Sequence, residues 1–292
     1  MAGPDTAPLF RRAVIAGVGL IGGSLALAGK RAGMFGRVIG VGRGRVNLEE
    51  ALRLGLVDEI TQDMAEAAKG ADFVFAAAPV ESIAQVILAA APHVAPDCVM
   101  TDGGSVKAKI VAYMEEKLPS SVRFVGGHPI AGKETSGAAA AGADLFKGRY
   151  TILTPTERTN PEALALVRAL WRSVGAEVET MTPAEHDHAL AFISHLPHVA
   201  AFALVDSVMK AENADTLRRY VAGGFKDTTR IAASDPVMWR DIFTMNRDEV
   251  LKAISEYEAS LARLKCAIDT RDAGGLHAML ENIARARREI DG

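Results

Sequence analysis

A glycine-rich stretch close to the N-terminus constrains the fold of this chain more than any other feature. Residues 17–24 read GVGLIGGS, with a β-branched run before them and an alanine-rich helical stretch behind them. In such a strand–turn–helix unit Gly17 permits the tight turn, Gly19 lets a pyrophosphate approach the backbone, and Gly22 lets helix and strand pack closely. A GxGxxG pattern alone is weak evidence, but here a second strand-like run, 38–41, ends about 20 residues later. The stretch therefore predicts a dinucleotide-binding turn.

Strand-like and helix-like segments alternate up to residue 181, and then the alternation stops. Alternation of this kind is typical of a parallel sheet covered by helices. We expect a Rossmann-type α/β domain over residues 1–181 and a second, all-α domain over residues 182–292. Strands are expected at 13–17, 38–41, 73–77, 99–101, 124–126, 151–153 and 177–180, and helices at 161–173, 183–209, 215–222, 236–268 and 271–289.

Composition excludes several classes of protein. The chain of 292 residues has 33 Lys and Arg against 36 Asp and Glu, a formal charge of −3, so nucleic acid is not an expected partner. Two cysteines, Cys98 and Cys266, lie in no metal-binding or disulfide pattern. No signal-peptide core and no run of about 18 apolar residues is evident, so we expect a soluble, cytoplasmic protein without a membrane segment.

The residues after the second predicted strand bear on the type of dinucleotide. An enzyme that prefers NAD normally has an acidic residue there, whereas this chain has Gly42, followed by Arg43 and Arg45. A guanidinium can bind a 2′-phosphate, so NADP is the expected cofactor, and NAD stays open because two arginines in a loop can be ordinary solvated charge. The predicted cofactor-binding residues are Gly17, Gly19, Leu20, Ile21, Gly22, Arg43, Arg45, Pro79 and Ser105.

Three further segments carry polar residues that suit catalysis. They read TDGGSVK at 101–107, GGHPIAG at 126–132 and GGFKDTTR at 223–230, and the first two follow predicted strands, where α/β sheets bind ligands. His128, between a glycine and a proline, is a candidate base or polariser beside a nicotinamide. Arg230 suits a bidentate grip on a carboxylate. Ser105 also fits the N-cap of a helix that starts near residue 106.

These segments together closely resemble the prephenate dehydrogenase family, which includes arogenate and cyclohexadienyl dehydrogenases. The resemblance rests on GVGLIGGS, TDGGSVK, GGHPIAG, SHLPH at 194–198 and GGFKDTTRIAASDPVMW at 223–239, five motifs in the right order. It implies NAD(P)-dependent oxidative decarboxylation of prephenate to 4-hydroxyphenylpyruvate in tyrosine biosynthesis. The same resemblance leaves open arogenate as the substrate, or a dual specificity for both.

The resemblance also implies roles for individual residues. His128 matches the catalytic histidine that takes the proton of the ring 4-hydroxyl, and Ser105 the serine that orients it and touches both ligands. Lys133 stands where some members have threonine, and its charge would repel the ammonium of arogenate and favour prephenate. The residues that match substrate-site positions are Arg230, His198, His195, Asp227 and Trp239, and a dimer formed by the helical half is expected.

Other interpretations of these residues and of the chain's function remain open. His186 and His188 lie near His195, but an i, i+2 pair is split across a helix, so no metal site is expected. A 3-hydroxyacid or imine reductase would need an asparagine partner for Lys226, and a non-catalytic NADP(H)-binding regulator would not need His128 or Arg230. We see no regulatory module after residue 290, so tyrosine would have to inhibit at the active site itself.

Overall fold

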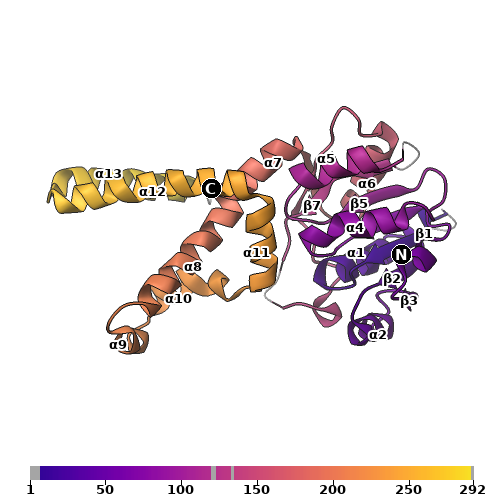
Figure 1. The fold of residues 1–292 in the computed structure, drawn as a ribbon, viewed down its shortest axis with the longest axis horizontal. Coiled ribbons are helices and arrows are strands. Elements are labelled where there is room, and N and C mark those ends of the chain that lie inside the picture. The colour runs from indigo at the N-terminus through magenta and orange to yellow at the C-terminus, as the bar shows by residue number, and fades with distance from the viewer. Residues whose placement is uncertain (1–6, 120–122, 133–134, 291–292) are drawn as a thin grey trace. The chain divides into compact units, whose positions relative to one another are not determined.

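The computed structural model describes residues 7–119, 123–132 and 135–290 (Figure 1). The chain divides into two compact units. The first, here called the sheet unit, comprises Met1–Leu190 and Ile231–Asn246, and the second, the helical unit, comprises Ala191–Arg230 and Arg247–Gly292. The two units are described separately below.

A six-stranded parallel sheet forms the centre of the sheet unit, with the strand order β3-β2-β1-β4-β5-β6. This order reverses between β1 and β4, which makes a doubly wound sheet with its ligand crevice at the reversal point. The predicted Rossmann-type fold is confirmed. The strands are β1 Phe10–Ala16, β2 Phe35–Val41, β3 Glu59–Thr61, β4 Phe73–Ala76, β5 Val99–Asp102 and β6 Arg123–Val125.

A smaller sheet of three strands follows in the same unit. It has the order β7-β8-β9, in which β7 Gly127–Pro129 is antiparallel to β8 Tyr150–Leu153, and β9 Glu177–Thr180 is parallel to β8. Only one residue separates β7 from β6, so the chain leaves the large sheet and enters the small one at Gly126. His128 therefore lies in the middle of a short strand and not in a loop.

Helices pack over these sheets (Figure 1), and the ends of the helix Pro161–Ser173 follow local sequence signals. The Asn160 side chain accepts a hydrogen bond from the Ala163 N–H (2.9 Å), Pro161 occupies the first turn, and Gly175, with φ +86°, follows the last. The helices of this unit are α1 Leu20–Arg31, α2 Arg45–Arg53, α3 Met64–Ala68, α4 Val80–Ala90, α5 Ala108–Lys117, α6 Pro161–Ser173, α7 Pro183–Leu190 and α11 Pro236–Met245.

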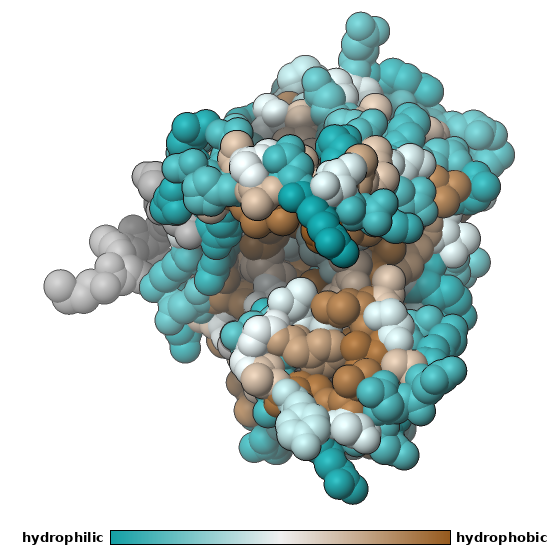
Figure 2. All heavy atoms as spheres, turned by 90° about the vertical axis from the view of Figure 1, so that its left-hand side faces the viewer, coloured by the Kyte–Doolittle hydropathy of each residue, from teal (hydrophilic) through white to brown (hydrophobic). Residues whose placement is uncertain are grey.

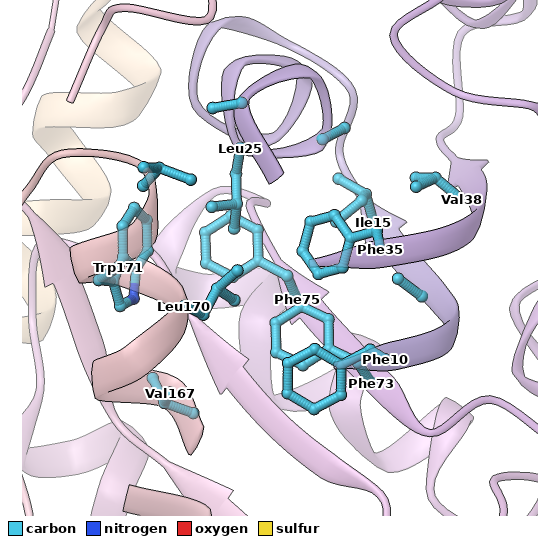
Figure 3. Packing of buried hydrophobic residues seen from close by; sticks show 14 of the residues in the cluster. Phe10, Ile15, Leu25, Phe35, Val38, Phe73, Phe75, Val167, Leu170 and Trp171 are labelled. Carbon is cyan, nitrogen blue, oxygen red and sulfur yellow. The ribbon is translucent and has the colours of Figure 1, made fainter. Parts of the chain in front are cut away.

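Aromatic and aliphatic side chains fill the space between the sheet and these helices (Figure 3). Phe73 lies 4.5 Å from Phe10 and 5.4 Å from Phe35 between ring centroids, and Phe75 meets Trp171 of α6 edge-on at 5.9 Å. All of these side chains are buried. This packing holds β1, β2 and β4 together with α6, and with them the strand ends next to the glycine-rich turn.

The helical unit contains no strand within the part of the chain that the structure describes. It starts with a π-helical turn, Ala191–His195, and α10 and α12 both pack against α8. Figure 1 shows α12 and α13 side by side as an antiparallel pair. The helices are α8 Leu196–Met209, α9 Ala214–Arg219, α10 Gly223–Thr229, α12 Arg247–Asp269 and α13 Ala273–Ile290.

Several sequence-based expectations differ from these elements. Strands β3 and β7, three residues each, and helix α10 were not predicted. The helix expected at 183–209 contains the π-helical turn, which precedes Pro197, a residue without the N–H that a regular helix needs. The helix expected at 236–268 is divided at Asn246. Also, α7 and α11 belong to the sheet unit, although they follow residue 181.

The helical run Pro183–Met209 is long and apolar enough to cross a membrane by length and composition. This is weak evidence, because a helix in the core of a soluble protein passes the same test. Of the residues in α8, only Ala201 is buried within this single chain.

Candidate active site

The glycine-rich turn has the geometry of a phosphate cradle. Gly17 has φ +96°, and a Cβ there would collide with the carbonyl oxygen of Ala77 at the end of β4. A Cβ at Gly22 would collide with the backbone of Gly17, so helix α1 and strand β1 pack as closely as the motif requires. At Gly19 a Cβ would meet nothing within 4 Å, which leaves the N-terminus of α1, beginning at Leu20, open to an anion. These residues fit a dinucleotide pyrophosphate.

The loop between β2 and α2 carries the two predicted arginines. Arg43 is exposed in the loop, and Arg45 begins α2 and pairs through Nε with Glu49 Oε1 at 2.8 Å. The Glu49 carboxylate raises the pKa of the Arg45 guanidinium, first through the hydrogen bond and then through its charge. Pro79 is the N-cap residue of α4. No carboxylate stands at Gly42 itself, where a Cβ would touch Leu48 at 3.4 Å.

Strand β5 ends in a buried ion pair. The side chains of Asp102 and Lys107 are both 0% exposed and in direct contact. Lys107 Nζ also donates to the carbonyl oxygen of Gly127 at 3.0 Å, while Asp102 accepts from the backbone N–H groups of Gly104 (2.9 Å) and Gly127 (3.1 Å). Burial lowers the pKa of Lys107, and the Asp102 charge opposes that shift. The pair therefore ties β7 to the end of β5.

The turn after β5 also touches the glycine-rich turn. A Cβ at Gly103 would lie 2.8 Å from the Phe75 ring and 3.5 Å from Cγ2 of Ile21 in the first turn of α1. A larger residue at this position would have to displace the Phe75 ring. Half-buried Ser105 follows two residues later.

Ser105 is not a helix cap, contrary to one of the two roles expected for it. Helix α5 begins at Ala108 with Lys107 as its N-cap residue. Its first backbone N–H groups donate instead to Asp187 of α7, from Lys107 N to Oδ1 (2.7 Å) and from Ala108 N to Oδ2 (2.8 Å). An acceptor that is distant in sequence thus replaces the local cap. The Ser105 hydroxyl is therefore not needed to cap α5.

His128 is half-buried in β7 and is hydrogen-bonded to a second histidine. Its Nδ1 lies 2.9 Å from Nε2 of His186, and the two rings are nearly edge-to-face, with centroids 5.1 Å apart. His186 is fully buried, and its Nδ1 lies 2.8 Å from Asp187 Oδ1. Burial lowers the pKa of His186, the Asp187 hydrogen bond opposes this, and the Lys107 charge lowers it further. The sheet unit thus presents an imidazole backed by a buried histidine and a carboxylate.

The helical unit holds four of the expected substrate residues. His198 of α8 is half-buried, and its Nδ1 donates to the Ser194 carbonyl oxygen (2.9 Å), while His195 is buried at the end of the π-helical turn. Burial lowers the pKa of His198. Asp227 and Arg230 are exposed on α10 and just beyond its end.

Two further predicted residues lie elsewhere. Trp239 belongs to the sheet unit, where it is buried in α11 with its ring 5.3 Å from that of Phe243, and α11 packs against α4. Lys133 lies outside the described residues. Within the described ranges, no group of three or more His, Cys, Asp or Glu side chains could hold a metal ion.

The sequence-based reasoning missed four residues of this site: Lys107, His186, Asp187 and Asn246. Asn246 donates from Nδ2 to the Asp187 carbonyl oxygen at 2.8 Å. One signal for Lys107 was present, since a lysine between apolar residues directly after a buried strand needs an acceptor. His186 and Asp187 gave no signal, because their partners lie 58 and 80 residues away in the sequence.

Comparison with known proteins agrees with this geometry. The model of the prephenate dehydrogenase nucleotide-binding domain matches residues 25–180, and that of the prephenate dehydrogenase dimerization domain matches residues 182–282. The chain belongs to the prephenate dehydrogenase family. The resemblance described from the motifs is confirmed, as is the expectation of an oxidoreductase with a domain that binds NAD or NADP.

Three relatives define its place in the prephenate dehydrogenase family. The prephenate dehydrogenase of Bacillus subtilis is 39% identical over 90% of this chain and 71% of its own, and the cyclohexadienyl dehydrogenase of Zymomonas mobilis is 35% identical over 96% of both. The crystal structure of A. aeolicus prephenate dehydrogenase with hydroxyphenyl propionate and NAD+ is 40% identical. It superimposes with a TM-score of 0.92 over 96% of this chain and 98% of that one.

Proposed function

We propose that this chain catalyses the NAD(P)-dependent oxidative decarboxylation of prephenate to 4-hydroxyphenylpyruvate, a step of tyrosine biosynthesis. The observation that carries the proposal is His128, a half-buried imidazole in β7 just after the end of β6, hydrogen-bonded to His186 at 2.9 Å. Membership in the family supports the reaction class, and the relatives from B. subtilis and Z. mobilis support the substrate class.

His128 acts in this reaction as the proton acceptor for the ring 4-hydroxyl. NAD(P)+, held at the glycine-rich turn, would supply the hydride acceptor for the carbon that carries this hydroxyl. Positive charge would build on that carbon, and transfer of the hydroxyl proton to His128 relieves it. The bond to the ring carboxylate then breaks, CO2 leaves, and its electron pair makes the ring aromatic. The oxygen regains a proton from His128, so the imidazole ends as it began.

Ser105 orients His128 and touches both ligands in this proposal. The turn of Ser105 begins at Asp102, whose carboxylate accepts the Gly127 N–H next to His128 (3.1 Å). The turn that carries Ser105 and the strand that carries His128 are therefore joined by a hydrogen bond between Asp102 and Gly127. Trp239 lines the pocket from α11 of the same unit.

The substrate carboxylates are held by the helical unit in this proposal. Prephenate is a dicarboxylate, and the planar, permanently charged guanidinium of exposed Arg230 suits a bidentate grip. His198 faces the ring, and its Nδ1–H donation to Ser194 leaves Nε2 as its acceptor atom. His195 supports it from the π-helical turn, and Asp227 of α10 closes the pocket.

Arogenate is the second candidate substrate, favoured by the 35% identity to a cyclohexadienyl dehydrogenase. Lys133 separates the two candidates, because its ammonium would repel the amino group of arogenate and leave the keto group of prephenate unaffected. The variant Lys133→Thr should then narrow the preference for prephenate. Equal kcat/KM for the two substrates in both wild type and variant would remove Lys133 from this role.

NADP is the preferred cofactor in this proposal. Gly42 supplies no carboxylate for the ribose hydroxyls, and Arg43 and Arg45 bring two guanidinium groups to the same loop. Arg45 is already paired with the Glu49 carboxylate. Substitution of Arg43 by alanine should therefore raise KM for NADP more than KM for NAD. A. aeolicus prephenate dehydrogenase was crystallised with NAD+. The Arg43→Ala variant therefore tests whether the loop of this chain favours NADP over NAD.

A homodimer formed by the helical unit completes the proposal. Several of its large apolar side chains are exposed in the single chain, among them Ile268 at 63%, Leu280 at 49% and Ile283 at 54%, and no residue of α13 is buried. Figure 2 shows hydrophobic residues, in brown, gathered at the surface in the view from the left-hand side of Figure 1. Residues 182–292 thus serve substrate binding and dimerisation, and tyrosine, which shares the product ring, would compete at the active site.

Initial rates of reduced-cofactor formation test the proposed function. Purified protein is assayed with prephenate and with arogenate, each with NADP and with NAD. We expect turnover with prephenate and NADP. Faster turnover with NAD would keep the reaction and overturn the cofactor preference. An absence of turnover with all four pairs would contradict the proposed function.

A further inference from the structure

Two buried residues of α7 connect His128 to the start of α5. His128 Nδ1 lies 2.9 Å from His186 Nε2, and His186 Nδ1 lies 2.8 Å from Asp187 Oδ1. Asp187 in turn accepts the backbone N–H groups of Lys107 and Ala108 at 2.7 and 2.8 Å. All five residues belong to the sheet unit. They form one continuous chain of hydrogen bonds from a helix N-terminus to the proposed base.

The acceptors in this chain decide where each proton lies. An ionised carboxylate only accepts, so Nδ1 of His186 must carry a proton and donate it to Asp187. In the neutral ring, Nε2 of His186 then holds a lone pair and can only accept. Nδ1 of His128 must therefore carry the proton that joins the two rings. Neutral His128 is left with Nε2 as its proton-accepting atom.

The surroundings of the two α7 residues hold them in place. His186 is 0% and Asp187 3% exposed, and Asn246 Nδ2 donates to the Asp187 carbonyl oxygen at 2.8 Å. The buried pair of Lys107 and Asp102 also holds Gly127, the residue before His128. Lys107 donates to the Gly127 carbonyl oxygen, and Asp102 accepts from the Gly127 N–H. Neither histidine can turn over without breaking a hydrogen bond of this network and leaving a polar group unsatisfied.

We propose that His186 and Asp187 are positioning residues that hold His128 in its Nδ1–H tautomer and so make Nε2 the atom that accepts the proton of the substrate hydroxyl. The tautomer assignment stands on the hydrogen bonds alone. Its consequence for catalysis rests on the proposed function of His128.

Burial favours the neutral form of His186, as the role requires, and the charged groups around it act in both directions. Asp187 from its own helix and Asp102 from β5 favour the protonated ring, while Lys107, which precedes α5, disfavours it. Burial is the largest influence and lowers the pKa of His186. A protonated His186 could not accept from His128. The positive charge of Lys107 thus helps to keep Nε2 of His186 unprotonated and able to accept from His128.

Nitrogen NMR of the histidine rings tests the tautomer without reference to activity. Two-bond ¹H–¹⁵N spectra of histidine-labelled protein at about pH 8 distinguish protonated from unprotonated ring nitrogens in neutral imidazoles. His128→Asn identifies the His128 signals by their loss. We expect a protonated Nδ1 and an unprotonated Nε2 for His128, and the same for His186. A proton on Nε2 of His128 would overturn the proposal.

Two substitutions at position 186 connect the tautomer to catalysis. His186→Leu removes the acceptor, and we expect His128 to populate both tautomers and kcat to fall about 10- to 100-fold with KM for the cofactor unchanged. The imidazolium of His128 also loses a hydrogen bond, so the acid limb of kcat/KM against pH should move to lower pH. His186→Gln can still accept through its side-chain oxygen and should recover much of kcat.

His188→Gln is the matched control, two residues along the same helix and exposed, and should behave as wild type. A purely structural role for His186 would lower Tm equally in both position-186 variants and leave the tautomer and the acid limb where they are. That result would overturn the proposal. If wild type turns over none of the candidate substrates, the NMR result still decides the tautomer, so the two failures are distinguishable.

Discussion

The sheet unit buries several of its titratable side chains, whereas those of the helical unit lie mostly at its surface. In the sheet unit, Lys107, Asp102 and His186 are 0% exposed and engaged in buried hydrogen bonds. In the helical unit, Arg230 and the ion pair of Lys210 with Asp206 are exposed. The first arrangement is fixed before any ligand arrives, since burial without these partners would cost several kcal/mol.

This difference separates two tasks within one enzyme. A proton acceptor must be held in one orientation and one tautomer, and the buried network of the sheet unit provides that. A group that binds substrate carboxylates must first be reachable from water, and Arg230, which we propose for this task, is exposed in the helical unit. The comparison therefore predicts large, chemistry-specific effects in the sheet unit and effects on binding or assembly in the helical unit.

The largest effect is expected for His128→Asn. Asparagine keeps a polar side chain but accepts a proton poorly, so kcat should fall about 10²- to 10⁴-fold. Kd for the cofactor, measured by fluorescence titration, should stay as in wild type, because the glycine-rich turn is untouched. His93→Asn, in an exposed turn after α4, is the control. Activity within a few-fold of wild type would remove His128 from the proposed role.

The same substitution in two ion pairs sharpens the comparison of the units. Asp102→Asn leaves the buried Lys107 without its counter-charge and should lower the free energy of unfolding by about 3–5 kcal/mol. Asp206→Asn breaks the exposed pair with Lys210, 2.8 Å apart on one face of α8, and should leave Tm unchanged within error. Urea unfolding measures both. Equal losses in the two variants would show that burial does not distinguish the pairs.

Arg230→Ala tests the helical unit as the source of the carboxylate grip. We expect kcat/KM for prephenate to fall by about 2–5 kcal/mol, roughly 30- to 5,000-fold, mainly through KM. Arg230→Lys keeps the charge without the planar fork and should lie between alanine and wild type. If KM in Arg230→Ala stays as in wild type, the substrate carboxylate is bound elsewhere.

A charged pair on α13 tests whether a second copy covers the apolar face of the helical unit. Leu280 and Ile283 lie three residues apart on one side of the helix and are about half exposed. Replacing both by glutamate should weaken dimerisation at least about 100-fold, since burial of each side chain contributes about 1.5–3 kcal/mol. Analytical ultracentrifugation reads the result. Leu52→Glu on α2 is the control, and a double variant that sediments as wild type would contradict this interface.

The parts of the fold that the sequence predicted are those set by local signals. The glycine-rich turn, the strands with continuous apolar runs, and α6 with its Asn160 cap and Gly175 stop all depend on residues within a few positions of one another. Strands β3 (EIT) and β7 (GHP) escaped prediction because each has three residues with at most one large apolar side chain, whereas β6, equally short, contains Phe124 and Val125. The break at Asn246 escaped because neither proline nor glycine marks it.

The candidate site was predictable where it consists of motifs and not where it consists of contacts. His128 stands out between Gly127 and Pro129, whereas the residue behind it, His186, lies 58 positions away. Asp187, 80 positions from Lys107, caps a helix that a nearby serine could have capped. Side chains that act on a helix from elsewhere in the fold follow from tertiary packing, which no local pattern encodes.

The smallest effect concerns the pH dependence of stability, which should differ between the two units. Burial lowers the pKa of His186 in the folded chain, so below about pH 6.5 the unfolded chain binds a proton that the folded chain does not. The stability that neutral His186 contributes is therefore complete above about pH 6.5 and is lost as pH falls below it. The free energy of unfolding then decreases by at most about 1.4 kcal/mol per pH unit. Free energies of unfolding in urea between pH 8 and pH 5.5 should thus fall less steeply for His186→Gln than for wild type.

His198 of the helical unit is only half-buried, and its bond to the Ser194 carbonyl opposes the lowering of its pKa, so His198→Gln should change the slope less. Parallel curves for wild type and His186→Gln would mean that the folded sheet unit accepts a proton on His186, and the neutral acceptor behind His128 would have to be abandoned.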